Sequence, residues 1–303
     1  MNVATLLDIP FDSITQTQVL ALIKQRLEEQ KTTRIVTINP EFLLEAERNS
    51  EFKEVLKSAD LHLADGIGIL WATHFLAIKP LFPKLYRAFP KLYSLYQCFY
   101  TLVLLPFTKK VTHNPLPERV TGSDLFIPLA QQLAATNQRI FLLGGAEGVA
   151  EKTAQILQSQ INNIEIAGYY SGSPKKDDAQ KIIAIINDSK ATALFVAFQF
   201  PAQDIWIAHY LPRLHQVKMA IGVGGTFDFI TGSSHIAHGN TNTKRAPHWM
   251  RKLNLEWLWR LITQPYRWKR IFNATVKFIK RVYRAKLSQL ISNPIDSYRG
   301  NEL

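Results

Sequence analysis

An acidic side chain, Asp65, follows the apolar stretch LHLA at residues 61–64 and precedes Gly66 and Gly68. A carboxylate at the end of a buried strand is costly unless it has a partner or a function. Asp65 could cap the next helix or hold a turn. It could also act as a general base, or orient one, with a pKa set by its surroundings. The spacing alone leaves the structural and catalytic interpretations open.

Polar residues and glycines also follow the other apolar runs of the chain, and any of them could contact a ligand. They are Thr37, Asn39, Gly144, Gly145, Gln203, Asp204, Gly224, Gly225 and Asp228. Glycines at such turns let backbone N–H groups approach a ligand, and a helix amino terminus behind them favours an anion. Glycines are equally common at such turns for packing reasons. Asn39 could bind a sugar or form a turn, and Asp228 could bind a ribose hydroxyl or cap its turn.

The elements that must position these residues alternate along the chain. Apolar runs typical of buried strands lie at 33–40, 61–64, 139–145, 164–172, 191–198 and 217–225. Helical spacing of apolar residues lies at 41–59, 123–136, 146–160, 177–190 and 201–214, with Ser123 as an expected N-cap. This order predicts an α/β fold with a mainly parallel sheet and helices on both faces. Ligands of such sheets bind at the carboxyl ends of the strands, where the polar residues above would meet.

Several kinds of site are not indicated by the sequence. His235 and His238 are three residues apart without a cysteine or a paired acid, and the chain has no Asp-x-Asp pair. It also has no P-loop, no Gly-x-Ser-x-Gly elbow and no dinucleotide-binding glycine pattern. We therefore expect neither a metal nor a cofactor. The single cysteine, Cys98, fits a reducing compartment, and the absence of a signal-peptide pattern or a long apolar run favours the cytoplasm.

The positive charge of the chain is concentrated near its end. Residues 244–286 carry 13 Lys and Arg against one acid, Glu256, which accounts for the whole net charge of +12. The same segment holds four of the six tryptophans, among leucines at helical spacing. Basic and aromatic residues suit nucleic acid as well as membranes, but an apolar face edged by Lys and Arg favours an anionic membrane surface. We therefore expect a core at 1–243 and a membrane-associating appendage at 244–303.

A second segment, residues 79–117, also interrupts the alternation and is rich in Pro, Tyr, Phe, Leu and Lys. It could be a helical hairpin packed on the core. It could also be a second membrane-contacting element.

The motifs of the chain, taken in order, resemble the WecG/TagA/CpsF family of bacterial glycosyltransferases from about Thr33 to Arg270, with one interruption. They are TINPEFLLEA, ADGIGI, ERVTGSDL, IFLLGGAEGVAEKTA, GVGGTFDFITG and RAPHWMRKLNLEWLWRLITQPYRWKR. The resemblance implies a Rossmann-like core with a C-terminal appendage. It implies metal-independent, inverting transfer of a sugar from a UDP-sugar donor to a polyprenyl-diphosphate-linked sugar at the inner face of the plasma membrane. The best-known members use UDP-N-acetylmannosamine or its uronic acid.

The resemblance also assigns roles to individual residues. Asp65 resembles the proposed catalytic base, with Thr37 and Asn39 beside it. Donor or substrate binding falls to Arg119, Gly144, Gly145, Gln203, Gly225, Asp228, Arg245, Arg260 and Arg267, the last three in the appendage that closes over the site. These types suit the reaction, because the attacking hydroxyl must lose a proton and the departing UDP gains negative charge.

One motif departs from the family pattern. Where the family has Gly-x-Pro-Lys-Gln-Glu, this chain has QFPAQD, with Gln199, Ala202 and Asp204 at the differing positions. The departure leaves the donor open between N-acetylmannosamine, glucose and another hexose, and it leaves an inactive scaffold as an alternative. An exposed apolar tail would also favour a homo-oligomer.

Overall fold

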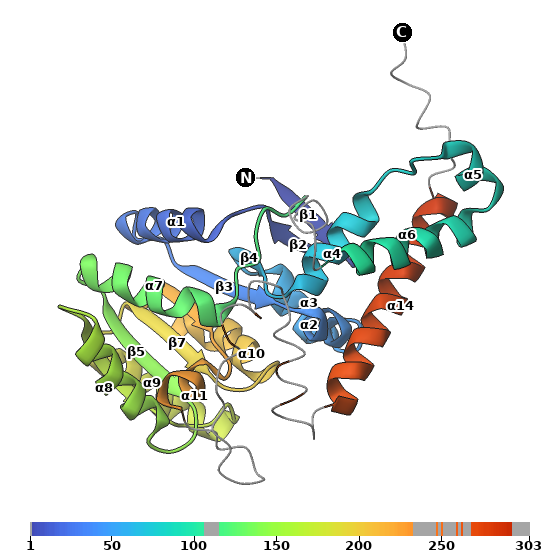
Figure 1. The fold of residues 1–303 in the computed structure, drawn as a ribbon. Helices are drawn as coiled ribbons and strands as arrows, with labels where there is room; N and C mark the ends of the chain where they lie inside the picture. Colours follow the sequence, from blue (N-terminus) through green and yellow to red (C-terminus); the bar gives the residue numbers. More distant parts are fainter. Residues whose placement is uncertain are drawn as a thin grey trace.

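We describe a computed structural model of the chain, over residues 2–105, 115–232 and 268–292 and the single positions 247, 250, 259 and 262. Its centre is a six-stranded parallel sheet with the order β4-β3-β8-β7-β5-β6 (Figure 1). The strands are β3 (Thr33–Ile38), β4 (Leu61–Ala64), β5 (Arg139–Gly144), β6 (Glu165–Tyr170), β7 (Ala193–Ala197) and β8 (Met219–Gly222). The predicted α/β class and the predicted parallel sheet are confirmed.

Helices cover both faces of this sheet. The residues of each strand alternate between two cores, so that Ile35 packs with one layer and Val36 with the other. One layer consists of α1 (Gln16–Glu28), α7 (Gly122–Ala135), α8 (Val149–Gln160) and α11 (Thr226–Thr231). The opposite layer contains α2 (Pro40–Ala46), α3 (Ser50–Lys57), α9 (Lys176–Ser189) and α10 (Ala202–Tyr210), followed by the short 3₁₀ helix η2 (Leu211–Arg213).

Three local features differ from the sequence expectations. The helix expected at 41–59 is two helices, because Asn49 adopts an extended backbone and its side chain accepts a hydrogen bond from the Phe52 N–H at 3.0 Å. Helix α7 is capped by Thr121 rather than Ser123, with the Thr121 hydroxyl accepting from the Asp124 N–H at 3.0 Å. An antiparallel hairpin, β1 (Val3–Leu6) and β2 (Ile9–Asp12), precedes the sheet and was not expected.

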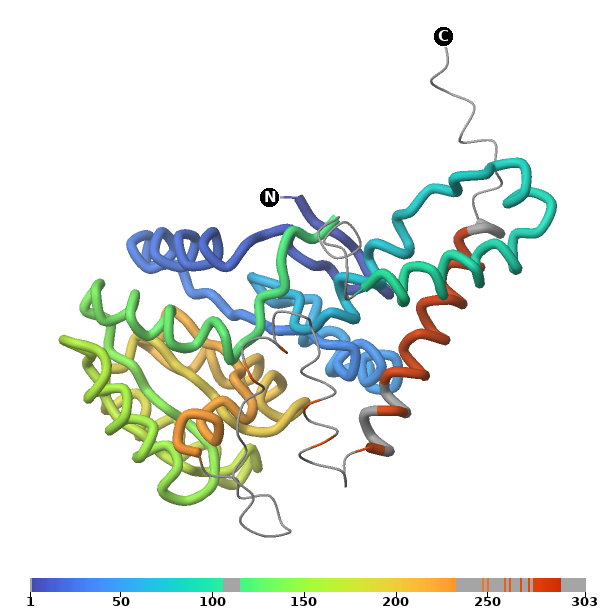
Figure 2. The backbone as a smooth tube through the Cα atoms, viewed as in Figure 1, coloured from blue at the N-terminus to red at the C-terminus, as the bar shows by residue number. Residues whose placement is uncertain are grey.

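The segment that interrupts the alternation forms helices. After α4 (Ile67–Ala77) come α5 (Pro83–Ala88) and α6 (Pro90–Leu104), which extend away from the sheet (Figure 1). The long helix α14 (Trp268–Ser292) runs beside α2, α4 and α6 (Figure 2). Buried Phe278 and Val282 join α14 to the core under α2 and α4.

Lys286 fixes α14 to the end of α4. Its Nζ donates to the carbonyls of Leu76 and Ile78 at 3.0 and 3.1 Å, and burial lowers its pKa to about 8. The lysine thereby pairs two carbonyls that the end of helix α4 leaves free. Among the residues that the structure describes, no helix combines the length and apolarity needed to span a bilayer.

Candidate functional site

The carboxyl ends of β3 and β4 bring Asn39 and Asp65 together. The two strands pair in register at Ile38 and Ala64, and the Asp65 N–H donates to the Ile38 carbonyl at 2.9 Å. Asn39 and Asp65 are therefore the first residues beyond two adjacent parallel strands, and both are half-buried. This places them at the edge of the sheet where ligands of open α/β folds bind.

The side chains of Asn39 and Asp65 have different local roles. The Asn39 Oδ1 accepts from the N–H groups of Glu41 and Phe42 at 2.9 and 3.2 Å, so it caps α2. Asp65 is not the N-cap residue of α4, because Gly66 occupies that position and Asp65 lies one residue before it. The structure leaves Asp65 as either a turn residue or a reactive group.

Arg119 approaches the same strand end. The N–H of Val120 donates to the carbonyl of Ala64 at 2.9 Å, which places the segment before α7 beside the last residue of β4. The Arg119 guanidinium lies 3.7 Å from the Asp124 carboxylate and is mostly shielded from solvent. Arg119 and Asp65, a cation and a carboxylate from distant parts of the sequence, therefore both lie near the end of β4.

Gln203 joins the start of α10 to the loop after β8. Its side chain is buried, and its Oε1 accepts from the Gly224 N–H at 3.0 Å. Packing is tight here, since a Cβ added to Gly222 would lie 2.7 Å from the Gln203 Cδ. Thr37 also lies near the end of β8, because a Cβ on Gly122 would come within 3.4 Å of the Thr37 Oγ1 and 3.6 Å of the Gly222 carbonyl oxygen. Thr37 and Gln203 thus flank the end of β8.

The glycines at the end of β5 lie against the end of β7 and the start of α11. The Gly145 N–H donates to the Ala197 carbonyl at 3.1 Å, and a Cβ on Gly145 would lie 3.7 Å from the Phe227 ring on α11. Asp228, one residue further along α11, is half-buried, and its Oδ2 would lie 3.7 Å from a Cβ on Gly225. Helix α8 begins behind these glycines without a side-chain cap; the Val149 N–H donates to the Ala146 carbonyl at 3.0 Å, and the following N–H groups of its first turn could face an anion.

The structure therefore gathers nine of the predicted residues at one edge of the sheet, in two groups. Around β3, β4 and the start of α7 lie Thr37, Asn39, Asp65 and Arg119; around β5, β7 and β8 lie Gly144, Gly145, Gln203, Gly225 and Asp228. Arg245, Arg260 and Arg267 lie outside the described residues, as do His235 and His238. Within the described ranges no three His, Cys, Asp or Glu side chains cluster as a metal would require.

Asp204, which stands in the sequence both as a polar residue after a strand and as a departure from the family pattern, is a buried acid beside Gln203. Its side chain is 2% exposed, and its Oδ2 accepts no hydrogen bond from the described residues. Burial raises the pKa of the Asp204 carboxyl to about 7, against the opposing effects of a Gln203 hydrogen bond and the Arg34 charge. The sequence did not indicate this burial, because Asp204 is a polar residue among helix-forming neighbours.

The raised pKa of Asp204 predicts a pH-dependent stability. Because the folded-state pKa lies above the ordinary value of 3.8, the protonated carboxyl favours folding below that value, and the contribution is lost as pH rises towards about 7. We expect wild-type protein to be less stable in urea at about pH 8 than at about pH 5, by on the order of a few kcal/mol. Asp204→Asn should lose much less stability over this range. An equal loss in both proteins would contradict the buried-acid explanation.

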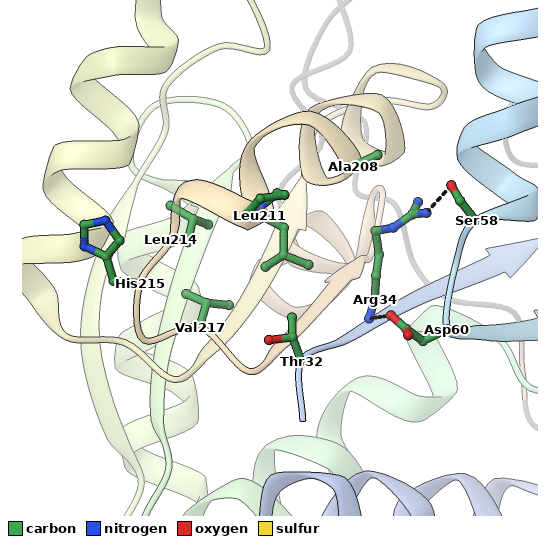
Figure 3. A pocket seen from close by; sticks show the side chains of 10 residues that line it. Thr32, Arg34, Ser58, Asp60, Ala208, Leu211, Leu214, His215 and Val217 are labelled. Atoms are coloured by element: carbon green, nitrogen blue, oxygen red, sulfur yellow. Dashed lines mark hydrogen bonds between the residues drawn. The ribbon is translucent and has the colours of Figure 1, made fainter. Parts of the chain in front are cut away.

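A cavity of about 700 Å³ lies at the opposite edge of the sheet (Figure 3). It is lined by Arg34 at the start of β3, Asp60 before β4 and Val217 before β8, together with residues around η2. The Arg34 guanidinium already donates to Val55 and Ser58, and the Asp60 carboxylate accepts from the Arg34 N–H. The polar groups of this cavity hold the ends of the strands in place, so we assign no ligand to it.

Comparison with known proteins identifies the relatives of this chain. Residues 4–87 and 103–291 match the model of the glycosyl transferase WecG/TagA/CpsF family. A Bacillus spizizenii protein named N-acetylglucosaminyldiphosphoundecaprenol N-acetyl-beta-D-mannosaminyltransferase is 31% identical over 247 residues, covering 82% of this chain and 77% of that protein.

Proteins with the same name from other bacteria have similar sequence identity to this chain. The Bacillus subtilis protein is 29% identical over 274 residues, covering 90% of this chain and 88% of its own length. A Staphylococcus aureus protein is 27% identical over 285 residues, covering 93% and 92%. With the matched sequence extending through the sheet, its polar edge and α14, the chain belongs to the WecG/TagA/CpsF family and is a glycosyltransferase.

Proposed function

We propose that this enzyme transfers N-acetylmannosamine from its UDP-linked form to a polyprenyl-diphosphate-linked sugar, as a step in the synthesis of a cell-surface polysaccharide. The observation that carries the proposal is Asp65, a half-buried carboxylate that directly follows β4 at the ligand-binding edge of the sheet, beside the Arg119 segment. The names of the relatives, which describe transfer of N-acetylmannosamine to a lipid-linked N-acetylglucosamine, support this substrate pair.

In the proposed reaction, Asp65 acts as the general base. An acceptor hydroxyl attacks the anomeric carbon of the donor while its proton passes to the Asp65 carboxylate. The bond from the anomeric carbon to the phosphate oxygen breaks, and its electron pair leaves with UDP. One displacement by one nucleophile inverts the anomeric configuration. Thr37 and Asn39 support this end of the site. Asn39 caps α2 through its Oδ1, and the NH₂ group of the same side chain could face the sugar.

The donor would bind on the β5–β7–β8 side of the same edge. Gln203 fixes the loop that carries Gly225 and Asp228, so these residues present backbone and carboxylate groups for the nucleoside. Gly144 and Gly145 lead to the uncapped amino end of α8, which suits a diphosphate. Arg119 would stabilise the charge on the departing UDP. We assign the same role to Arg245, Arg260 and Arg267 of the appendage.

We further propose that the enzyme works as a peripheral protein on the inner face of the plasma membrane. The basic aromatic segment 244–286, within the appendage 244–303, would bind anionic lipid and bring the core 1–243 to its lipid-linked acceptor. Nucleic acid is not an expected partner, and no metal or cofactor enters the reaction as proposed. Self-association through apolar surface is compatible with this arrangement.

A donor screen tests the proposed substrate. Purified enzyme is given an N-acetylglucosaminyl-diphosphate lipid and, in separate reactions, UDP-N-acetylmannosamine, UDP-glucose and other UDP-hexoses, and the lipid product is measured. We expect UDP-N-acetylmannosamine to be used best. Preference for another hexose would assign that sugar to the same mechanism. No transfer from any UDP-hexose would support the inactive-scaffold alternative that the QFPAQD motif raises.

A further inference from the structure

The helices α5 and α6 expose an unusual number of large apolar side chains. We call this set the hairpin face: Leu81, Phe82, Leu85, Phe89, Leu92, Leu95, Tyr96, Phe99, Tyr100 and Val103. The most exposed of them, Leu81, Phe99 and Leu92, are 78%, 69% and 67% accessible to solvent. Contiguous apolar surface on this scale marks a site of interaction with another molecule or a membrane.

The opposite side of α6 is firmly packed, so the orientation of the hairpin face is fixed. Tyr93, Cys98 and Thr101 are buried, and the Trp71 indole N–H donates to the Thr101 hydroxyl at 2.9 Å. The Tyr283 hydroxyl of α14 donates to the Lys91 carbonyl at 3.0 Å. These contacts hold α6 against α4 and α14, and the side chains of the hairpin face on α6 remain exposed among the residues that the structure describes.

The part of the hairpin face on α6 lies largely in a segment that the family pattern lacks. The matched ranges of the family end at 87 and resume at 103, which leaves most of α6 without a counterpart. A segment that the shared fold does not need, yet that is anchored by the buried hydrogen bond from Trp71 to Thr101, indicates a function specific to this protein.

The charge around the hairpin face identifies the kind of surface that fits it. The sequence has no acid between Asp65 and Glu118, while Lys79, Lys84, Arg87 and Lys91 lie along the hairpin. Aromatic and aliphatic side chains flanked only by cations are typical of elements that enter the interface of an anionic bilayer.

We propose that the hairpin face docks on an anionic lipid bilayer and forms a second membrane contact, distinct from the basic segment 244–286. This docking also sets the position of the active site. Helix α4 joins the residue after Asp65 to the hairpin through 11 residues, a rise of about 16 Å at about 1.5 Å per residue. The Asp65 edge is thus held about one short helix from the lipid surface that carries the acceptor.

Vesicle binding by the full-length protein tests the proposal. The variant Leu92→Ser/Phe99→Ser is compared with Val3→Ser/Tyr169→Ser, which removes two exposed apolar side chains elsewhere. On vesicles containing phosphatidylglycerol, we expect the hairpin variant to bind about tenfold or more weakly than wild type, and the control to bind as wild type. Equal binding by both variants would overturn the proposal. Thermal unfolding of each variant shows that the fold is intact.

A second pair of variants tests whether the basic residues of the hairpin contribute to vesicle binding. Lys84→Glu/Lys91→Glu should weaken binding to the anionic vesicles severalfold, whereas Lys24→Glu/Lys176→Glu, at exposed sites outside the hairpin, should have little effect. Equal effects of the two charge reversals would contradict docking by the hairpin. If sedimentation instead shows that the wild type is a dimer and Leu92→Ser/Phe99→Ser a monomer with unchanged vesicle binding, the face is a contact between two copies and the proposal is wrong.

The proposal can be separated from the proposed reaction. The hairpin variant should retain turnover on a water-soluble, short-chain acceptor and lose it selectively on an acceptor embedded in vesicles. Loss of turnover on both acceptors would overturn a role confined to membrane docking. Absence of turnover in the wild type would bear on the proposed function alone, because vesicle binding is measured without donor or acceptor.

Discussion

Replacement of Asp65 by asparagine is expected to reduce kcat by about 10²- to 10⁴-fold, the range in which a positioned general base contributes. Asparagine keeps the size and most of the hydrogen-bonding capacity of the side chain, but its amide cannot accept the proton of the attacking hydroxyl. Asp65 follows β4 at its junction with Asn39 and the Arg119 segment, so the loss would act at the proposed point of attack. Turnover of a lipid-linked acceptor is the measurement.

A matched control for this variant lies at the other end of the same strand. Asp60 precedes β4, accepts a hydrogen bond from the Arg34 N–H at 2.8 Å and belongs to the opposite edge of the sheet. Asp60→Asn should leave kcat within a few-fold of wild type. If Asp65→Asn keeps full turnover, Asp65 is a turn residue and the base must be sought elsewhere. If both variants lose turnover equally, the effect is on folding and not on the reaction.

Replacement of Gly144 by alanine is expected to destabilise the fold by about 2–5 kcal/mol, through overpacking and a strained backbone. Gly144 has a φ of +101°, and a Cβ there would lie 2.7 Å from the backbone carbon of Ala197 on the adjacent strand β7. Neither the strand nor the turn can move without breaking the pairing of β5 with β7. Urea unfolding measures the change in free energy.

A substitution at Gly148 separates the overpacking from the backbone strain that together destabilise Gly144→Ala. It also has a positive φ, +76°, but a Cβ there would meet no atom within 4 Å. Gly148→Ala should therefore cost only the backbone strain, about 1–2 kcal/mol. If the two variants are destabilised equally, the close approach of β5 and β7 makes no contribution, and the packing described at this edge is wrong.

The sheet could be predicted because its strands carry a strong local signal. A buried parallel strand such as Ala193–Ala197 is a continuous apolar run, and the polar residues after such runs could be placed at one edge from topology alone. Boundaries that depend on one backbone conformation could not be predicted. The apolar spacing of Phe42, Phe52 and Leu56 continues through Asn49, where the chain leaves the helical conformation.

Contacts between distant segments also could not be predicted from the sequence. The hydrogen bond from Gly224 to Gln203, the packing of Gly122 against Thr37 and the burial of Asp204 all depend on how strands and helices pack. The role of Asp65 as a cap was a local hypothesis, and Gly66 took that place instead. For the segment 79–117, the helical alternative is seen in α5 and α6, with α6 packed on the core; residues 106–114 lie outside the described residues, and membrane contact remains a proposal.

The central claim is a single displacement of UDP by a sugar hydroxyl at the edge that carries Asp65. The most direct test is the anomeric configuration of the product, determined by NMR after transfer from the preferred UDP-sugar to an N-acetylglucosaminyl-diphosphate acceptor. The account predicts a new glycosidic bond with the configuration opposite to that of the donor. A product that retains the donor configuration would require two displacements and would contradict a mechanism with Asp65 as its only base.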